Sequence, residues 1–210
     1  MPKDNLMTGF AQPFEGAQKV PSPKLDLFIR RGFLEAAECA EIVAMIDARR
    51  RPSTIADDNG DPLFRTSETC DLDPAHPLTT ALDERIASFL GLHVDYGEPM
   101  QGQRYAPGQE FKLHTDYFEP DGADYATHCT VSGQRSWTAM IYLNEPEAGG
   151  ATRFKAIDKI VQPETGKILC WNNMLAWGAP NPNTLHQGMK VRKGTKYVIT
   201  KWFRERPWGG

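Results

Sequence analysis

From about residue 98 to residue 206 the sequence consists of short β-rich runs separated by Gly, Pro and Asn, and this pattern limits the folds open to the chain. The clearest runs cover residues 101–105, 136–144, 167–171 and 195–203. Many short strands at such spacing are typical of a sandwich or a jelly roll. The pattern therefore predicts a mainly β fold that closes around a pocket.

Two helices are expected before these strands. Over 34–50 and again over 77–90, apolar residues recur at helical spacing, and Gly91 follows the second run as a C-terminal stop. The first run has acids at its start and arginines at its end, which suits the helix dipole. We therefore expect an α+β domain with helical support over about 33–91 and a jelly-roll core over about 98–206.

Two segments lack the signals of packed structure. Residues 1–24 carry four prolines and few apolar residues, which predicts an extended or disordered N-terminal arm before a domain at 25–210. Residues 53–64 form a strong turn signal, Asp-Asp-Asn-Gly-Asp-Pro, without a hydrophobic anchor. We expect this second segment to be mobile.

Composition excludes several classes of protein. The chain has 210 residues, which suits one domain, and its 40% hydrophobic content is enough for a substantial core. A net charge of −3 with interspersed basic residues gives no nucleic-acid face and no site for an anionic membrane. The four cysteines form no Cys-x-x-Cys pair, and the chain shows neither a signal-peptide core nor a membrane-spanning stretch. We therefore expect reduced thiols and a soluble, cytoplasmic protein.

Three residues offer the ligands for one metal ion. His114 and Asp116 lie two apart, so they point the same way if the chain is extended there, and His186 follows further on. Two imidazoles and one carboxylate form the facial triad of non-heme Fe(II) oxygenases, which leaves coordination positions open. The His-x-Asp pair alone is a weak signal, because a polar pair at the rim of a fold has the same sequence.

Lys196 strengthens the hypothesis. The two-residue period of a strand places Lys196 on one face with Val198, Thr200 and Trp202. A lysine on such a face is poorly solvated and needs an anionic partner. A dicarboxylate bound to the neighbouring metal would supply one.

The other histidines are weaker candidates for the third ligand. His76 precedes a proline at a helix start, His93 follows Gly91, and His128 lies in a polar loop. His186 could itself be a core histidine beside Leu185. It differs from its rivals in the glycine and lysine that follow it.

With these residues in view, the chain resembles the prolyl 4-hydroxylase family of Fe(II)/2-oxoglutarate-dependent dioxygenases, in its bacterial, single-domain form. The order and spacing of the matching stretches hold across roughly 25–206, and the ordered set is specific although each fragment is common. These stretches are Glu-Pro-Met-Gln-Gly-Gln-Arg-Tyr at 98–105, Pro-Gly-Gln-Glu-Phe-x-x-His-x-Asp at 107–116, Gly-Gln-Arg-Ser-Trp-Thr-Ala-Met-Ile-Tyr-Leu-Asn at 133–144, Gly-Gly-Ala-Thr-Arg-Phe at 149–154, Pro-x-x-Gly at 163–166 and Leu-His-Gln-Gly-x-x-Val-x-x-Gly-x-Lys-Tyr at 185–197.

The resemblance implies a double-stranded β-helix (a cupin-like jelly roll) and a cofactor set of Fe(II), 2-oxoglutarate and O2, with ascorbate as a reductant. It implies that Lys196 pairs with the distal carboxylate of 2-oxoglutarate and that Tyr105 and Thr138 lie near the same cofactor. A tyrosine or threonine at these positions is also ordinary filler on a β surface.

On the substrate side, the resemblance assigns five residues to a peptide groove. Each could equally be a surface charge or a packed side chain. They are Arg65, Ser67, Glu98, Arg135 and Trp202.

Two residues depart from the family pattern. Phe111 stands three before His114, where relatives often place tyrosine, and Arg204 stands two after Trp202, where peptide hydroxylases may carry histidine. Both fall on the substrate side and leave the metal chemistry unaffected.

Three functions compete. The leading hypothesis is a peptidyl-proline 4-hydroxylase, with segment 53–64 as a lid. The second is the same chemistry on a small molecule such as a free amino acid, which Phe111 and Arg204 leave open. The third is a non-catalytic metal-binding or partner-binding jelly roll, which has no need for an open metal site beside an anion receptor. The sequence does not decide the oligomeric state.

Overall fold

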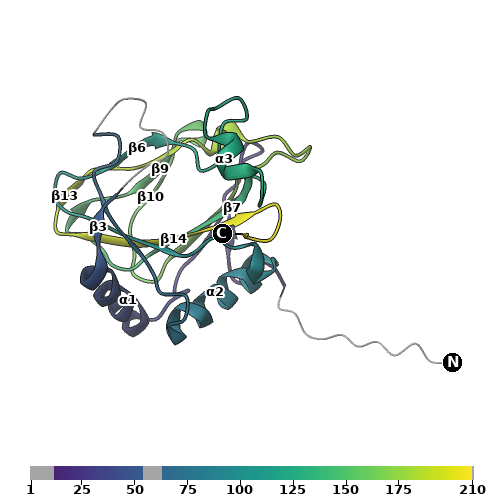
Figure 1. Cartoon of the computed structure of the whole chain (residues 1–210). Coiled ribbons are helices and arrows are strands. Elements are labelled where there is room, and N and C mark those ends of the chain that lie inside the picture. The colour runs from purple at the N-terminus through teal and green to yellow at the C-terminus, as the bar shows by residue number, and fades with distance from the viewer. Residues whose placement is uncertain (1–11, 54–62, 210) are drawn as a thin grey trace.

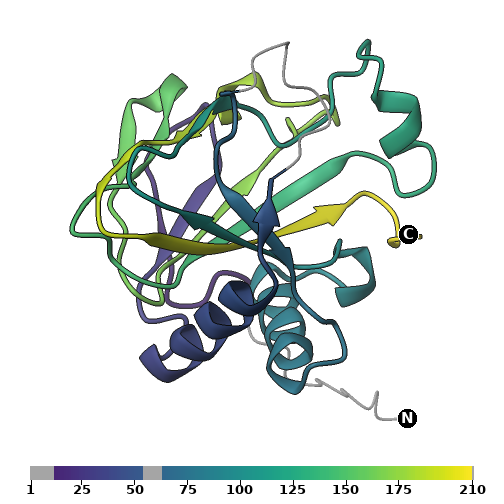
Figure 2. The same cartoon turned by 60° about the vertical axis from the view of Figure 1, so that its left-hand side comes forward.

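The computed structural model describes residues 12–53 and 63–209. Most strands of this part of the chain form two sheets that pack face to face (Figure 1). Helices α1 and α2 cover the outer face of the larger sheet, while α3 lies at the other end of the molecule (Figures 1 and 2). The expected mainly β fold with flanking helices is confirmed.

The larger sheet has eight strands and the smaller has four, and two further strands form a short ladder. In spatial order, the larger sheet contains β1 (Gln18–Lys19), β2 (Leu27–Arg30), β11 (Ile168–Asn172), β7 (Arg135–Tyr142), β14 (Lys196–Arg204), β5 (Gln101–Tyr105), β4 (Glu68–Asp71) and β3 (Arg51–Pro52). The smaller contains β10 (Lys159–Val161), β9 (Thr152–Phe154), β12 (His186–Gly188) and β6 (Phe111–His114), and the ladder pairs β13 (Val191–Lys193) with β8 (Ala148–Gly149). The α-helices are α1 (Ala36–Arg49), α2 (Pro77–Leu90) and α3 (Tyr125–Cys129), with 3-10 turns at Val94–Tyr96, Lys155–Ile157 and Pro182–Thr184.

Helices α1 and α2 form where their apolar periodicity predicts. A capping box begins α1, in which the backbone N–H of Glu35 donates to the Glu38 carboxylate at 2.8 Å. Gly91 ends α2 in the left-handed region at φ 69°, a conformation that glycine adopts without strain. Both helices bury their apolar faces against the larger sheet.

The larger sheet divides the interior into two cores, as the side chains of its strand β7 show. Ala139 and Ile141 face the helices, whereas Met140 and Tyr142 face the smaller sheet. This alternation follows from the two-residue period of a strand. The second core lies between the sheets, and the candidate site lies beside it.

Several expectations about the edges of the fold can be compared with the structure. Residues 1–11 of the expected N-terminal arm lie outside the described part of the chain, but the rest of the arm is packed where an unpacked segment was expected. The ring of Phe14 stacks on Phe28 with centroids 3.8 Å apart, and β1 pairs with β2. Most of the expected mobile segment, 54–62, also lies outside the described residues.

The arginines at the end of α1 and the four cysteines agree with the expectations from the sequence. Arg50 follows the last turn of α1 and donates to the backbone oxygen of Asp47 at 2.7 Å. All four cysteines are buried and free. Among the described residues, no helix has both the length and the apolar composition needed to cross a membrane.

Candidate metal and 2-oxoglutarate site

The three predicted metal ligands meet at the edge of the smaller sheet. His114 ends β6, His186 begins β12, and these two residues face each other in the antiparallel register. Asp116 follows in the bend after β6. Within the described residues, one ligand atom from each of the three lies within 4.8 Å of the others.

Both imidazoles are oriented for metal binding. Nδ1 of His114 lies 2.7 Å from the backbone oxygen of Lys112, and Nδ1 of His186 lies 2.9 Å from that of Thr184. Because a carbonyl oxygen only accepts, each Nδ1 carries the proton and each Nε2 presents its lone pair. Burial is the main reason that the pKa of His114 falls to about 3, so this ring is neutral at physiological pH, as a ligand must be.

Asp116 remains ionised although it is buried. Burial alone would raise the pKa of its carboxyl group, but the two imidazoles, Arg135 and a hydrogen bond from Thr138 outweigh that effect and lower it. The Thr138 hydroxyl donates to Oδ2 of Asp116 at 2.8 Å. The structure thus places Thr138, with 0% exposure, directly behind a metal ligand.

Lys196 is a buried amine without an anionic partner among the described residues. Only 2% of the residue is exposed, and within the described part of the chain Nζ makes no hydrogen bond or ion pair. Its nearest recorded contacts are the ring faces of Tyr105 and Tyr142, at 5.0 and 5.3 Å from the centroids. Burial lowers the pKa of Lys196 to about 7. A bound carboxylate would remove the cost of this burial.

One cavity joins the triad to the lysine. It is lined by all three ligands and by Lys196, Val198, Thr200 and Trp202, so the predicted shared face of β14 is confirmed. A wider cavity of about 370 Å³ between α1 and β4 has mainly apolar walls and lies away from the ligands. The chemistry is therefore located in the smaller cavity, between the two sheets.

Comparison with known proteins shows the family. The model of the 2OG-Fe(II) oxygenase superfamily matches residues 100–204, a stretch that contains the triad and Lys196. The chain belongs to this superfamily. It is a 2-oxoglutarate-dependent dioxygenase, and its cofactors are Fe(II), 2-oxoglutarate and O2.

Named relatives are prolyl hydroxylases. "Probable prolyl 4-hydroxylase 4" of Arabidopsis thaliana is 27% identical over 92% of this chain and 71% of its own length. "Prolyl 4-hydroxylase subunit alpha-1" of Homo sapiens is 32% identical over 62% of this chain but only 24% of its own length. The structure of the viral collagen prolyl hydroxylase vCPH from Paramecium Bursaria Chlorella virus-1, as a 2OG complex, superposes with a TM-score of 0.68 at 26% identity. The match covers 85% of this chain and 95% of that one. The expected double-stranded β-helix is confirmed.

The residues of the oxygenase fit its cofactors. Two imidazole lone pairs and one carboxylate are a suitable donor set for Fe(II). The unpaired ammonium of Lys196 suits the distal carboxylate of 2-oxoglutarate. A Cβ at Gly188 would stand 3.8 Å from Nζ of Lys196, so glycine leaves room for a ligand there.

Tyr105 lies where the resemblance implied, in the wall of the same cavity. Its hydroxyl donates to Oε1 of Gln103 at 2.8 Å. Burial raises the pKa of the phenol, which therefore stays protonated and able to donate. Thr138 is not among the lining residues, because Asp116 lies in front of it.

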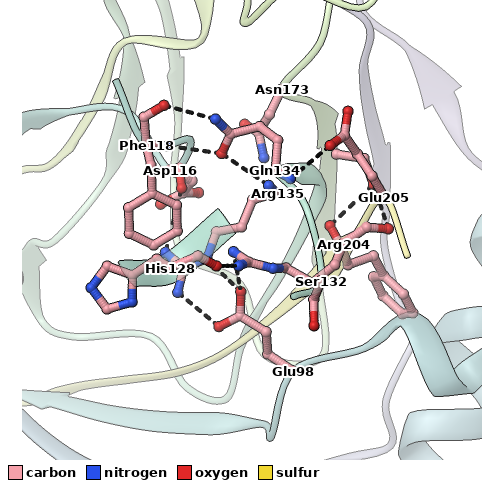
Figure 3. Close-up of polar contacts among 12 residues, drawn as sticks. Glu98, Asp116, Phe118, His128, Ser132, Gln134, Arg135, Asn173, Arg204 and Glu205 are labelled. Atoms are coloured by element: carbon pink, nitrogen blue, oxygen red, sulfur yellow. Dashed lines mark hydrogen bonds and ion pairs between the residues drawn. The ribbon is translucent and has the colours of Figure 1, made fainter. Parts of the chain in front are cut away.

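The predicted substrate residues Glu98, Arg135 and Trp202 form one cluster next to Asp116. Figure 3 shows Glu98 and Arg135 of this cluster together with Asp116. Arg135 donates to both oxygens of Glu98, at 2.7 and 2.8 Å, and its guanidinium lies 4.0 Å from the centroid of the Trp202 ring. Nη1 of Arg135 also donates to the backbone oxygen of Asp116 at 3.4 Å. The cluster therefore connects the cavity wall to the metal ligand.

Arg204, a departure from the family pattern, joins this cluster. Its Nη1 donates to Oε1 of Glu98 at 3.2 Å, so the buried guanidinium of Arg204 and the half-buried one of Arg135 share one carboxylate. Its Nη2 donates to the backbone oxygen of His128 in α3. Figure 3 shows both contacts.

The other predicted substrate residues, Arg65 and Ser67, lie near Phe111 and His114. The Phe111 ring stacks on the His114 ring with centroids 3.5 Å apart, and the Arg65 guanidinium lies 5.0 Å from the Phe111 centroid. Arg65 donates to Ser67 Oγ at 3.0 Å and to Gln101 Oε1 at 2.9 Å. The second departure, Phe111, thus contacts the predicted metal ligand His114 directly.

The rival histidines have other environments. Nε2 of His76 lies 3.9 Å from a Glu41 oxygen, His93 caps a 3-10 turn, and the His128 ring stacks on Phe118. Of the histidines and carboxylates that the structure describes, only the triad forms a metal-binding group.

Sequence reasoning missed one polar residue at this site. Asn173 follows β11 and donates through Nδ2 to the Thr138 hydroxyl at 2.9 Å. A single asparagine after a strand carries no distinguishing signal. Only the pairing of β11 with β7 brings it to the site.

Proposed function

We propose that this oxygenase hydroxylates proline in a peptide or protein, as a prolyl 4-hydroxylase. The observation that carries the proposal is the cluster of Glu98, Arg135 and Trp202 in contact with the loop of Asp116. The aromatic face of Trp202 can pack on a proline ring, and the fixed guanidinium of Arg135 beside it can donate to a peptide carbonyl. The names of the curated relatives support the same substrate.

In this proposal, His114, Asp116 and His186 hold Fe(II), and Lys196 binds the distal carboxylate of 2-oxoglutarate. Tyr105 lines the cavity beside Lys196, and its hydroxyl would have to turn from Gln103 to donate to the same cofactor. When bound, Fe(II) and 2-oxoglutarate supply the activation of O2 that oxidises an aliphatic C–H bond. The chain contributes open coordination positions, fixed ligands and a cavity closed between two sheets.

The substrate residues then act by positioning. Trp202 lines the cavity and its Nε1 is buried without a partner among the described residues, so it can donate to a bound substrate. Arg135 is held on two sides, by Glu98 and by Asp116, and presents a rigid surface. Arg65 lies over the ring of Phe111, which lines the same cavity, and it donates to Ser67.

The test compares two reactions of the same enzyme. Proline-containing peptides are incubated with Fe(II), 2-oxoglutarate and O2, and mass spectrometry detects the addition of one oxygen to proline. Arg65→Ala or Arg135→Ala should reduce peptide hydroxylation more than the 2-oxoglutarate decay that occurs without substrate. Arg104→Ala is the matched control, because Arg104 is held by Glu68 on another part of the sheet. A parallel fall of both reactions in the Arg65 and Arg135 variants would assign these arginines to the fold or the cofactor site instead.

The second candidate is the same chemistry on a small molecule such as a free amino acid. Phe111 removes a hydroxyl from the site, and Arg204 adds a guanidinium to the Glu98 cluster. Oxygen addition to free proline, with no product on peptides, would favour this candidate.

We also propose a cytoplasmic location and the use of ascorbate as a reductant. The four free cysteines support a reducing compartment. Comparison of turnover with and without ascorbate would test the second point.

A further inference from the structure

The carboxylate of Asp116 has two oxygens with different environments. Oδ1 lies 3.8 Å from Nε2 of His114 and accepts no hydrogen bond from the described residues, whereas Oδ2 lies 3.9 Å from Nε2 of His186 and accepts the Thr138 hydroxyl at 2.8 Å. Only Oδ1 is therefore free of protein donors.

The direction of this hydrogen bond is set by a third residue. Nδ2 of Asn173 donates to the Thr138 oxygen at 2.9 Å. An amide NH₂ can only donate and a carboxylate can only accept, so the single hydroxyl proton of Thr138 points to Asp116. Asn173, Thr138 and Asp116 thus form a chain of donors that ends on Oδ2.

The position of Asn173 is fixed by the backbone. Its N–H donates to the oxygen of Ser136 at 2.8 Å, and its carbonyl accepts from the N–H of Asn181 at 2.8 Å. Figure 3 shows its side chain near Gln134, and the residue is 0% exposed. Its Oδ1 is buried without a partner in the described part of the chain. Buried acceptors are rarely left unpaired. If Asn173 served stability alone, we would expect both its Nδ2 and its Oδ1 to have a hydrogen-bond partner.

We propose that Thr138 and Asn173 are positioning residues that restrict Asp116 to binding the metal through one oxygen. This inference rests on the proposed role of the triad. His114, His186 and one oxygen of Asp116 would hold the metal and leave positions open for a chelating 2-oxo acid and O2. A carboxylate that bound through both oxygens would leave fewer positions open.

Three substitutions test the proposal with binding measurements that do not depend on turnover. Thr138→Val keeps the shape of the side chain and removes the hydroxyl, Thr138→Ser keeps the hydroxyl, and Asn173→Ala removes the upstream donor. Mn(II) is titrated into the metal-free protein, and 2-oxoglutarate is then titrated into the Mn(II)-loaded protein, both by calorimetry. Thr79→Val is the matched control, because Thr79 is equally buried but lies in α2.

We expect Thr138→Val to bind Mn(II) and to lose about 10- to 100-fold in affinity for 2-oxoglutarate, the usual effect of removing a partner of a metal ligand. Thr138→Ser and Thr79→Val should stay within about twofold of the wild type. The 2-oxoglutarate affinity of Asn173→Ala should lie between those of Thr138→Val and the wild type. In this variant the Thr138 hydroxyl is still present, but no donor directs its proton toward Asp116.

The proposal is overturned if Thr138→Val binds 2-oxoglutarate as the wild type does. If melting curves show that this variant does not fold, wild-type affinity in Asn173→Ala overturns it instead. Failure of the triad is a separate result: His114→Ala and the wild type would then bind Mn(II) equally, and both proposals would fall.

Discussion

Replacing Lys196 by methionine should weaken 2-oxoglutarate binding and also stabilise the cofactor-free protein. Nζ of Lys196 is buried without an anion in the part of the chain that the structure describes, and burial lowers its pKa from 10.5 to about 7. At about 1.36 kcal/mol for each tenfold change in proton affinity, this corresponds to a cost on the order of 5 kcal/mol for the charged form. Methionine fills a similar volume without charge, so the variant avoids this cost.

The sign of the pH dependence follows from the lowered pKa. Between pH 7 and 10.5 the unfolded chain carries a proton on Lys196 that the folded chain lacks, so the stability of the wild type rises with pH through this window. The stability advantage of Lys196→Met should therefore be largest at and below pH 7 and disappear near pH 10.5. Denaturant unfolding of the metal-free proteins at several pH values measures it.

The affinity for 2-oxoglutarate should fall in Lys196→Met, although the stability of the cofactor-free protein rises. An ion pair to a carboxylate in a partly dry cavity contributes on the order of 2–4 kcal/mol. The dissociation constant should thus rise roughly 30- to 700-fold in Lys196→Met, with Fe(II) affinity unchanged. Calorimetric titration under anaerobic conditions would measure both constants.

A second lysine of β14 provides the matched control. Lys201 is also buried, but its Nζ lies 2.9 Å from Asp83. Lys201→Met leaves a buried carboxylate unpaired, so it should lose stability and keep its affinity for 2-oxoglutarate. An unchanged 2-oxoglutarate titration in Lys196→Met, or equal effects of the two substitutions, would refute the assignment of Lys196 as the anion receptor.

Three further outcomes are expected. His114→Ala and His186→Ala should each abolish O2-dependent decarboxylation of 2-oxoglutarate, and near-wild-type turnover with Fe(II) would show that the substituted histidine is not a ligand. Glu98→Gln should destabilise the fold by about 3 kcal/mol, roughly 6–12 °C in Tm by calorimetry, because the buried Arg204 and the half-buried Arg135 lose their shared carboxylate. An unchanged Tm would show that Glu98 does not balance the charges of the two arginines. Arg204→His should change the preference between peptide and free proline, measured as the ratio of kcat/KM values, and leave substrate-free 2-oxoglutarate decay unchanged.

The sequence predicted the parts of the fold that depend on local pattern. The helix at 77–90 and the strand at 101–105 agree residue for residue with α2 and β5, because periodicity and terminal residues determine such elements locally. Strand β14 begins one residue after the expected start, at Lys196. The strands β9, β10 and β12 of the smaller sheet were not predicted, since each has three residues and is too short to show a period.

The roles of individual side chains depended on contacts that sequence does not encode locally. Thr138 was expected near 2-oxoglutarate, but whether a strand residue faces a ligand or supports Asp116 depends on how the two sheets are placed. Asn173 reaches Thr138 from 35 residues away. The packing of Phe14 on Phe28 was missed because four prolines in 1–24 suggested an unpacked arm.

The two departures from the family pattern bear on the substrate through different contacts. Phe111 stacks on His114 and cannot hydrogen-bond, so it contributes shape and an apolar surface next to the metal position. Arg204 contributes charge, because Glu98 cannot neutralise two guanidiniums at once. The Glu98 cluster therefore carries one more positive charge than a pair of Glu98 and Arg135 alone. A bound substrate that brings a carboxylate close to Trp202 would be favoured by that charge, whereas a neutral peptide would gain nothing from it. The ratio measured for Arg204→His thus reports directly on the charge of the substrate.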